Sequence, residues 1–573
     1  MGCRTLRKLA LWVPALLFAV LVCAQTPQPL VMSEQPTIRV TTRLVQVSVV
    51  VHDKHGQPVT DLTRDDFTVL DGKRPEKIAL FAVESSRTLP GPSQSLPADT
   101  FANRLEYRQE VPTSVTIILF DGLNTQFMDQ AWAREQVLRF LRQLRPEDRV
   151  AIYVLGSQLK ILHDFTRDAR LLIQALGRYK GNESLELQAS EPVDSRSAGL
   201  TSRLPDGALL LRELNSFFHV TDEPMIEFFT ARRVEKTLRA LEAIALHAGR
   251  FPGRKSLLWV SGSFPFWLGS DSTGLCTSPR CRERRSFSSE VERTARALND
   301  SNLAVYPVDA RGLGAGLPSA ADPSFRLQMG GSGWSEEHLS TVDTMTILAE
   351  RTGGQAYYNT NDIFGAIRKA VDDGRVTYAL AYYPTHDRWD GRFREIKVEV
   401  KRPGLRARYR RGYFALQQGA LDVQQRKAVL DEAIWTPLDA TSIGLVVKAR
   451  SEQTASGIVL RLQLLVDPRD LTLWQQGDRW VGNLDILFAQ PDAEGLKVKG
   501  VSNTLDLRLK QQRYELIMRE GLVLTQKVDI VPAAHQLRIV VRDATSGAIG
   551  TVTVPLSQFI EKQNGQPSAT PKG

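Results

Sequence analysis

The feature that most constrains this 573-residue chain is the stretch TIILFDGLNT, residues 116–125. Four apolar residues, 117–120, end abruptly at Asp121, and turn-forming residues and a helical pattern follow. A short, fully apolar run of this kind is typical of a central parallel strand that is covered on both faces. Because open α/β sheets bind their ligands beyond the carboxyl ends of the strands, the pattern puts Asp121 at the candidate site.

Strand and helix patterns alternate after this stretch, and they predict an α/β domain over residues 113–375. The patterns before and after it favour β structure, because apolar residues there alternate with a period of two. We therefore expect, along the chain, a small β module (37–87), a linker (88–112), the α/β domain (113–375), a β extension (376–416), a helical linker (417–434), a β-sandwich (440–557) and a disordered tail (558–573).

The first 24 residues have the three parts of a secretory signal peptide. A basic start precedes an apolar run over 9–22, and Val22-Cys23-Ala24 is a small-residue cleavage site. We expect cleavage before Gln25 and export to the periplasm, the cell envelope or the extracellular space. An uncleaved anchor is one alternative, although the apolar run is short for a span of about 20 residues. A lipoprotein acylated at Cys23 is another, although Val22 before the cysteine is bulky where a small residue is expected.

The formal net charge of +9 is modest for a chain of this length. Three of these charges belong to the signal peptide, which leaves 9 − 3 = +6, so together with export the charge argues against a nucleic-acid partner. Arg406, Arg408 and Arg410 alternate on one predicted strand, where they could dock an anionic surface or form a solvated sheet face. No later stretch is apolar enough to predict a membrane span in the mature chain.

Two cysteines, Cys276 and Cys281, lie beyond the signal peptide. Their close spacing and the oxidising environment of an exported protein predict a disulfide that closes a loop. A metal pair is the alternative, but no second thiol pair or nearby histidines complete a zinc site.

Several segments carry a family resemblance in the same order along the chain. They are the strand–DGLNT–helix stretch, the preceding VVVHDKHGQPVTDLTRDDFTVLDGK, the internal PGRKSLLWVSG and VYPVDARGL, and the following YYPTHDRWDGRFREIKVEVKRPGLRARYRRGYFA. Over about residues 37–416 the chain resembles the exported bacterial VWFA-related domain proteins, which are abundant in Acidobacteria. The resemblance implies a von Willebrand factor A-like doubly wound sheet with helices on both faces, flanked by an N-terminal immunoglobulin-like (Ig-like) β module and a C-terminal β-sandwich.

Many von Willebrand factor A domains carry a metal-ion-dependent adhesion site, which begins with D-x-S-x-S after the first strand. Its carboxylate and hydroxyls present hard oxygen ligands to a cation such as Mg²⁺. In this chain Asp121 matches the aspartate and Thr125 the second hydroxyl, while Asn124 offers an amide oxygen nearby. Leu123 occupies the first hydroxyl position and cannot bind a metal ion.

The later ligands of that motif are matched less well. Ser261-Gly262 stands where an aspartate is expected, and Thr221 and Thr230 are the candidates for a loop threonine. The resemblance thus implies a degenerate site in which Asp121, Asn124 and Thr125 hold Mg²⁺ or another divalent cation weakly. The alternative is structural, because a carboxylate at a strand end can accept hydrogen bonds from its own turn and cap the next helix.

Motifs of catalysis are missing from the sequence, which has no nucleophile elbow, no H-E-x-x-H and no phosphate loop. We expect a non-enzymatic protein-interaction or adhesion protein with a protein partner, contacted through the segments 180–225 and 264–285. The alternatives are a secreted hydrolase that uses Asp121 with Asp309 as a carboxylate pair, and a scaffold of an envelope assembly.

Overall fold

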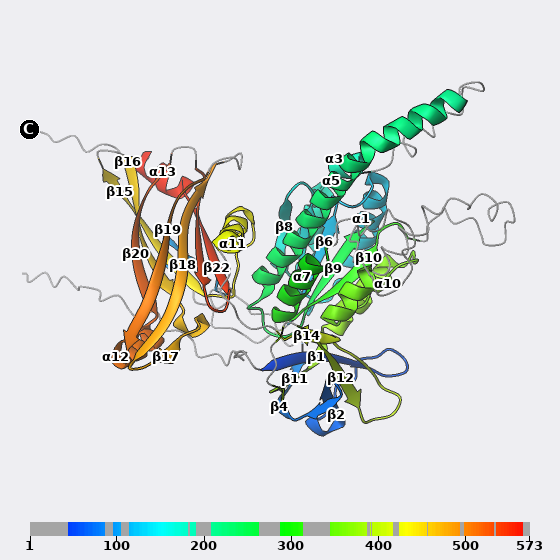
Figure 1. The fold of residues 1–573 in the computed structure, drawn as a ribbon, viewed down its shortest axis with the longest axis horizontal. Coiled ribbons are helices and arrows are strands. Elements are labelled where there is room, and N and C mark those ends of the chain that lie inside the picture. Colours follow the sequence, from blue (N-terminus) through cyan, green and yellow to red (C-terminus); the bar gives the residue numbers. More distant parts are fainter. Residues whose placement is uncertain are drawn as a thin grey trace, which may run out of the picture. The chain divides into compact units, whose positions relative to one another are not determined.

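The structure is a computed structural model (Figure 1). It describes residues 44–85, 96–104, 114–181, 184–190, 208–262, 287–312, 344–386, 390, 392–415, 423–454, 457–492, 498–531 and 534–564. The predicted signal peptide (1–24), the predicted Cys276–Cys281 disulfide and the predicted contact loop at 264–285 lie outside these ranges.

The stretch around Asp121 forms the middle strand of a five-stranded sheet in the order β10-β9-β6-β7-β8. The first four strands are parallel, and β8 pairs with β7 in the antiparallel direction. The strands are β6 (Val115–Asp121), β7 (Val150–Leu155), β8 (Leu159–Thr166), β9 (Lys255–Ser261) and β10 (Leu303–Asp309). Every residue of β6 is buried, as its apolar run predicts for a central strand.

Helices cover both faces of this sheet. Ile117 and Leu119 of β6 belong to one core with α5 and α7, whereas Ile118 and Phe120 belong to a second core with α1, α2 and α10. The helices are α1 (Phe127–Leu141), α2 (Ala169–Arg178), α3 (Leu185–Ala189), α5 (Ala208–Ala248), α7 (Ser288–Asp300) and α10 (Ile363–Asp373). The expectation of a mixed α/β chain is confirmed.

The predicted β module (37–87) and β extension (376–416) form one structure, although the α/β domain separates them in the sequence. Strand β1 pairs with β11 on one edge and with β13 on the other, and β2 pairs with β12. The two sheets have the orders β13-β1-β11-β4 and β14-β12-β2-β3. Their strands are β1 (Val45–His52), β2 (Phe67–Asp71), β3 (Arg74–Glu76), β4 (Ile78–Ser85), β11 (Val376–Tyr382), β12 (Phe393–Val400), β13 (Arg406–Arg408) and β14 (Gly412–Phe414).

The alternating arginines of the RARYRR stretch do not form an exposed stripe. Arg408 donates to the buried Asp373 at 2.6 Å, and Arg410 donates to the carbonyl of Gln46 at 2.7 Å. Both guanidinium groups are partly buried and paired within the protein, and only Arg406 is exposed. The idea of an anionic docking face made by Arg406, Arg408 and Arg410 is therefore wrong.

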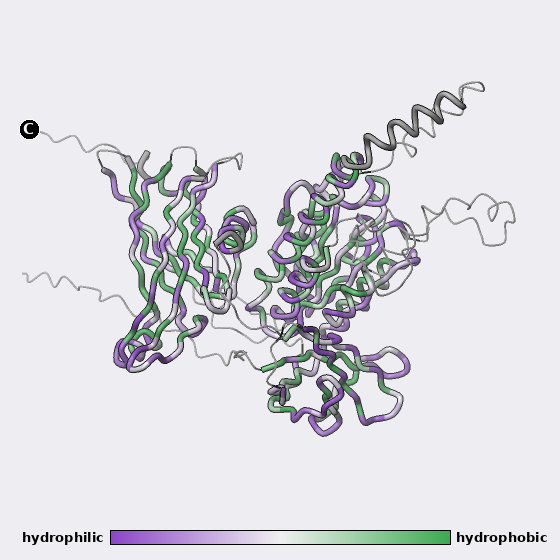
Figure 2. Tube along the Cα trace, viewed as in Figure 1, coloured by the Kyte–Doolittle hydropathy of each residue, from purple (hydrophilic) through white to green (hydrophobic). Residues whose placement is uncertain are grey.

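The C-terminal β structure also consists of two sheets, with the orders β20-β16-β15-β5 and β17-β18-β21-β22, and β19 pairs with β18. Hydrophobic and hydrophilic residues alternate over parts of its strands (Figure 2). The elements are β15 (Leu445–Thr454), β16 (Gly457–Val466), β17 (Trp474–Gln476), β18 (Arg479–Pro491), β19 (Val498–Lys510), α12 (Gln511–Glu520), β20 (Leu522–Asp529), β21 (Gln536–Asp543) and β22 (Ile549–Pro555).

Two boundaries differ from the predictions. The segment predicted as a linker (88–112) contains β5 (Thr100–Ala102), which pairs with β15 and so belongs to the C-terminal sheet. The segment predicted as a disordered tail (558–573) starts with α13 (Ser557–Asn564), because Phe559 is fully buried in the C-terminal core. The predicted helical linker contains α11 (Val423–Trp435).

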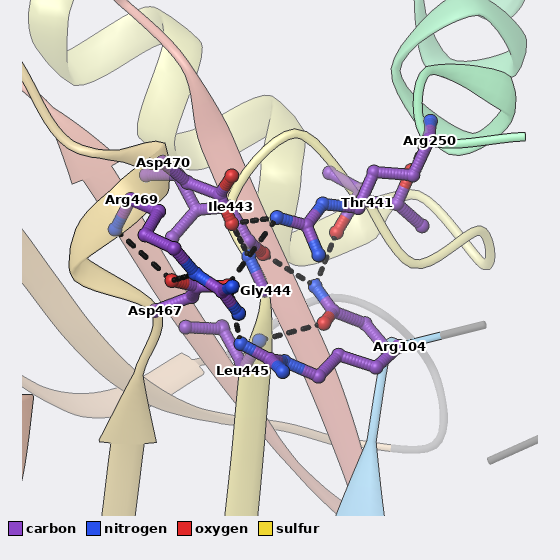
Figure 3. A network of polar contacts seen from close by, with 11 residues as sticks. Arg104, Arg250, Thr441, Ile443, Gly444, Leu445, Asp467, Arg469 and Asp470 are labelled. Carbon is purple, nitrogen blue, oxygen red and sulfur yellow. Dashed lines mark hydrogen bonds and ion pairs between the residues drawn. The ribbon is translucent and has the colours of Figure 1, made fainter. Parts of the chain in front are cut away.

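A network of buried charges follows the end of α5 (Figure 3). Arg250 pairs with Asp470, whose carboxylate also accepts from the backbone N–H of Gly444 at 2.9 Å. Arg104, which follows β5, donates to Asp467 at 2.6 Å. The network connects three segments that are distant in sequence. Because its side chains are largely buried, the loss of one charge would leave its partner without compensation away from water.

Among the helices that the structure describes, none is both long and apolar enough to cross a membrane.

Candidate functional site

Asp121 is the last residue of β6 and lies at the carboxyl end of the parallel strands. Its neighbours in the sheet are β9 on one side and β7 on the other. The side chain is almost completely buried, at 2% exposure. The predicted site residue is therefore in the expected place, but it lies beneath the surface.

The Asp121 carboxylate accepts hydrogen bonds from donors of one strand and one turn. Its Oδ1 accepts from the backbone N–H of Asn124 at 3.0 Å. Its Oδ2 accepts from Asn124 Nδ2 at 2.8 Å, and from Trp259 Nε1 and Ser261 Oγ of β9 at 2.9 Å each. These contacts fix the turn after β6 against β9.

Asn124 extends this network to α5. Its Nδ2 also donates to Thr237 Oγ1 at 2.8 Å, and its Oδ1 accepts from Arg233 Nε at 3.0 Å. Arg233 is buried and pairs in addition with the hydroxyl of Ser190, next to α3. The Arg233 guanidinium thus contacts Asn124, which in turn donates to Asp121.

Thr125 completes the turn through its hydroxyl and its carbonyl. Its Oγ1 accepts from the backbone N–H of Gly262 at 2.8 Å, and its carbonyl accepts from Gln130 Nε2 at 2.7 Å. A Cβ at position 262 would lie 3.2 Å from the Thr125 Cα, which is tighter than ordinary van der Waals contact. Glycine at 262 lets the two backbones approach each other at this point.

Burial raises the pKa of the Asp121 carboxyl, because a charge is costly in an apolar environment. The hydrogen bonds from Asn124, Trp259 and Ser261 oppose this shift. The pKa of the nearby Tyr179 hydroxyl is also raised, first by burial and then by the charge of Asp121. The four donors therefore offset part of the free-energy cost of burying the charged form of the Asp121 carboxylate.

This arrangement does not fit a divalent cation. Three donors converge on Asp121 Oδ2, the Asn124 amide oxygen already faces the Arg233 guanidinium, and Thr125 Oγ1 accepts from a backbone N–H. In the part of the chain that the structure describes, no three histidine, cysteine, aspartate or glutamate residues are grouped so that they could hold a metal ion. Cation binding by Asp121, Asn124 and Thr125 stays a prediction, and it would require these contacts to rearrange.

The other positions of the motif have structural roles. Leu123 is fully buried in the core beneath α5, where a hydroxyl would replace apolar contacts. Thr221 and Thr230, the candidates for a loop threonine, both belong to the helix α5. The expectation that either lies on a loop of the rim is wrong.

The carboxylate pair of the hydrolase alternative is not formed. Asp309 ends β10, and β9 lies between β10 and β6, so the strands of Asp121 and Asp309 are not neighbours. Asp309 pairs with Arg311, which donates to it at 2.8 Å. Both carboxylates are thus occupied by other groups, and the idea that they act together is wrong.

Sequence reasoning did not identify Arg233, Thr237 or Trp259 as part of the site. Arg233 and Thr237 flank Val234 on a buried face of α5, and Trp259 lies inside an apolar strand. A polar residue on an otherwise apolar helical face was the available signal, because a buried polar group needs a partner.

Around this network, large apolar side chains are exposed on the elements that follow the turn. Phe127 and Met128 start α1 and are 49% and 77% exposed. Leu185 starts α3, which Lys236 of α5 holds through an ion pair to Glu186 at 2.6 Å. We call Phe127, Met128 and Leu185 the apolar rim.

Comparisons with known proteins give only remote likenesses. No protein-family model and no curated protein matches the chain. Solved structures that match include an aerotolerance-related membrane protein of Bacteroides fragilis, at 12% identity and TM-score 0.21, covering 46% of this chain and 98% of the other.

Two further matches illustrate the range. The VWA domain of SpRpn10 has 12% identity and TM-score 0.17, covering 34% of this chain and 74% of the other. The PilB minor pilin of Streptococcus sanguinis has 11% identity and TM-score 0.24, covering 46% and 60%. At these TM-scores the likenesses carry no argument about this chain.

Proposed function

We propose that this chain is an exported, non-catalytic interaction protein that contacts a protein partner through the strand-end edge of its α/β domain. The observation that supports this best is the combination of buried, occupied carboxylates with exposed apolar side chains at the same edge. Exposed apolar groups rimmed by polar residues are typical of protein contact sites.

We also propose that the metal-assisted step of adhesion is lost here and that hydrogen bonds replace it. In a metal-ion-dependent site the cation holds several loops together and binds a partner carboxylate. Here Asp121 links the turn to β9, and Asn124 links it to α5 through Thr237 and Arg233. The loops are then fixed without a cation, and apolar contact supplies the affinity.

A binding experiment with matched variants tests this function. The mature chain, beginning at Gln25, is immobilised and exposed to the envelope fraction of its native cells, and captured proteins are identified and quantified. A Phe127→Glu, Met128→Glu double variant replaces the two residues of the apolar rim at the start of α1, where acidic residues suit the helix, and leaves Leu185 in place. Val523→Glu is the control, because Val523 is 50% exposed on the C-terminal strand β20.

The proposal expects one captured protein whose affinity falls at least tenfold in the double variant and is unchanged in the control. Equal capture by all three proteins would place the contact elsewhere and refute the proposal. Size-exclusion chromatography of the native complex then separates a binary adhesion pair from a large envelope scaffold, because the two differ in mass.

A further inference from the structure

The strand β19 is a long edge of the C-terminal β structure (Figure 1). It pairs with β18 in one unbroken register, from the pair of Arg479 and Lys510 to the pair of Pro491 and Val498. Among the strands that the structure describes, β19 pairs with β18 alone, so its second row of backbone N–H and C=O groups has no strand beside it there. With 13 residues, β19 is about twice as long as a usual strand of about 5–6 residues.

Proteins protect the edges of their sheets, because such a row of hydrogen-bonding groups attracts another strand. Short edge strands, bulges and prolines are common means of protection. At two other sheet ends of the C-terminal structure, β5 and β17 have three residues each. In contrast, β19 is long, its pairing runs without a register shift, and it contains no proline. This edge is therefore suited to a further strand.

The helix α12, which follows β19 directly, turns back toward β18. Trp480 Nε1 of β18 donates to Gln511 Oε1 at 2.9 Å, and the Trp480 ring stacks on Tyr514 with 4.1 Å between the ring centres. Further along the helix, Ile517 is buried in the C-terminal core. The helix thus packs on the β18 side of β19 and does not take the place of a further strand.

The C-terminal part of β19 has the sequence Leu505-Asp506-Leu507-Arg508-Leu509. Its three leucines belong to the C-terminal core, where Leu507 is buried and the other two are only partly buried. Asp506 and Arg508 are exposed and lie on the opposite face of the sheet, because side chains alternate along a strand. The apolar layer therefore reaches the edge of the sheet and is incompletely covered there.

This sequence is complementary to itself in the antiparallel direction. When two copies pair about a two-fold axis at Leu507, Asp506 of each copy lies opposite Arg508 of the other, and Leu505 lies opposite Leu509. Opposite charges and apolar side chains that face each other in this way stabilise a strand pair. An axis at residue 506 or 508 would instead bring like charges together, which is destabilising.

We propose that residues 504–510 of β19 pair with the same residues of a second copy and make the protein a two-fold symmetric dimer. The paired segment is about 24 Å long at about 3.4 Å per residue. The pairing continues one sheet into the other, so that the leucines of both copies cover one another. A second copy always supplies the complementary charges, which favours it over an extended segment of another protein. The dimer goes beyond the proposed partner contact on the α/β domain and does not depend on it.

Charge reversal tests the pairing by sedimentation equilibrium of the chain from Gln25 onward, without the predicted signal peptide. We expect the parent to have the mass of a dimer at micromolar concentration. Asp506→Arg and Arg508→Asp each replace two attractions by two repulsions, so each should weaken self-association at least tenfold. An equimolar mixture of the two variants should recover a dimer, because each copy then meets the opposite charge in the other.

Asp529→Arg is the matched control. It makes the same change of charge at an exposed position of β20, which belongs to the other C-terminal sheet, and it should leave the dimer unchanged. Circular dichroism checks that each variant is folded. Amide hydrogen exchange adds a second readout, because N–H groups of residues 504–510 should exchange more slowly in the parent than in Asp506→Arg.

A parent that is a monomer at all concentrations would overturn the proposal, and so would a dimer that both single variants keep. A mixture of the two variants that stays monomeric would contradict the register. Equal exchange of residues 504–510 in the parent and in Asp506→Arg would place the contact between copies elsewhere and would also overturn the pairing through β19.

Discussion

Replacement of Asp121 by alanine is the perturbation whose effect follows most directly from the contacts. The substitution leaves four donors without their acceptor: the backbone N–H and Nδ2 of Asn124, Trp259 Nε1 and Ser261 Oγ. Two of these, the amide side chain and the hydroxyl, can turn toward other acceptors. The backbone N–H and the indole N–H are less free to turn, because the first belongs to the turn after β6 and the second to a buried side chain of β9.

The magnitude can be worked from these two fixed donors. An unsatisfied buried donor costs about 1–3 kcal/mol, so two cost about 2–6 kcal/mol. Removal of a buried charge recovers part of this, because Asp121 no longer has to be desolvated. We expect a loss of about 3 kcal/mol in the free energy of unfolding, which lowers Tm by about 6–12 °C for a domain of this size.

Urea unfolding followed by tryptophan fluorescence measures this loss, with calorimetry as a second probe. Asp478→Ala is the control, because the Asp478 side chain is 83% exposed, and it should change the free energy of unfolding by less than about 0.5 kcal/mol. An Asp121→Ala protein with the urea midpoint of the parent would refute the view that the network holds the turn.

Two further predictions concern buried groups of β9. Burial lowers the pKa of Lys255 from 10.5 to about 8, so the unfolded chain binds more protons between these values and stability rises with pH there. Between these pH values the free energy of unfolding, measured by urea titration, should rise by up to about 3 kcal/mol in the parent. Lys255→Met should abolish this rise, and the exposed Lys448→Met should preserve it. The same rise in both variants would contradict the assignment to Lys255. Trp259→Phe removes the donor to Asp121 and should cost about 1–2 kcal/mol, whereas the exposed Trp474→Phe should cost nothing measurable; equal effects would contradict the network.

The position of Asp121 could be predicted because it depends on local sequence. An apolar run that ends in a turn specifies a buried parallel strand, and the residue after the run lies at the strand end. The buried face of the C-terminal half of α5 was also readable, because its apolar residues follow helical spacing. These features need no knowledge of distant contacts.

The connections between distant segments could not be predicted in this way. Strand β1 finds its partners in β11 and β13, which follow the whole α/β domain in the sequence, and β5 joins a sheet whose other strands begin at Leu445. A period of two indicates a strand but says nothing of its neighbours, because many edges have the same hydrogen-bonding groups.

The hydrogen-bond partners of Asp121 could not be predicted for a related reason. The groups that complete its network come from β9 and α5, and neither is adjacent to it in sequence. The motif D-x-S-x-S specifies oxygen ligands only, whereas in this chain the Arg233 guanidinium donates to the Asn124 amide oxygen. Likewise, Asp309 was placed on the correct edge, but strand order decides whether two carboxylates meet.

Calorimetric titration with Mg²⁺, Mn²⁺ and Ca²⁺ tests most directly the claim that hydrogen bonds replace a cation at the strand ends. The protein is the chain from Gln25 onward, without the predicted signal peptide, with Asp121→Ala beside it. We predict no saturable heat with any of the three metals up to millimolar concentration, for either protein. Saturable binding by the parent that disappears in Asp121→Ala would contradict this account and would establish a working, altered adhesion site.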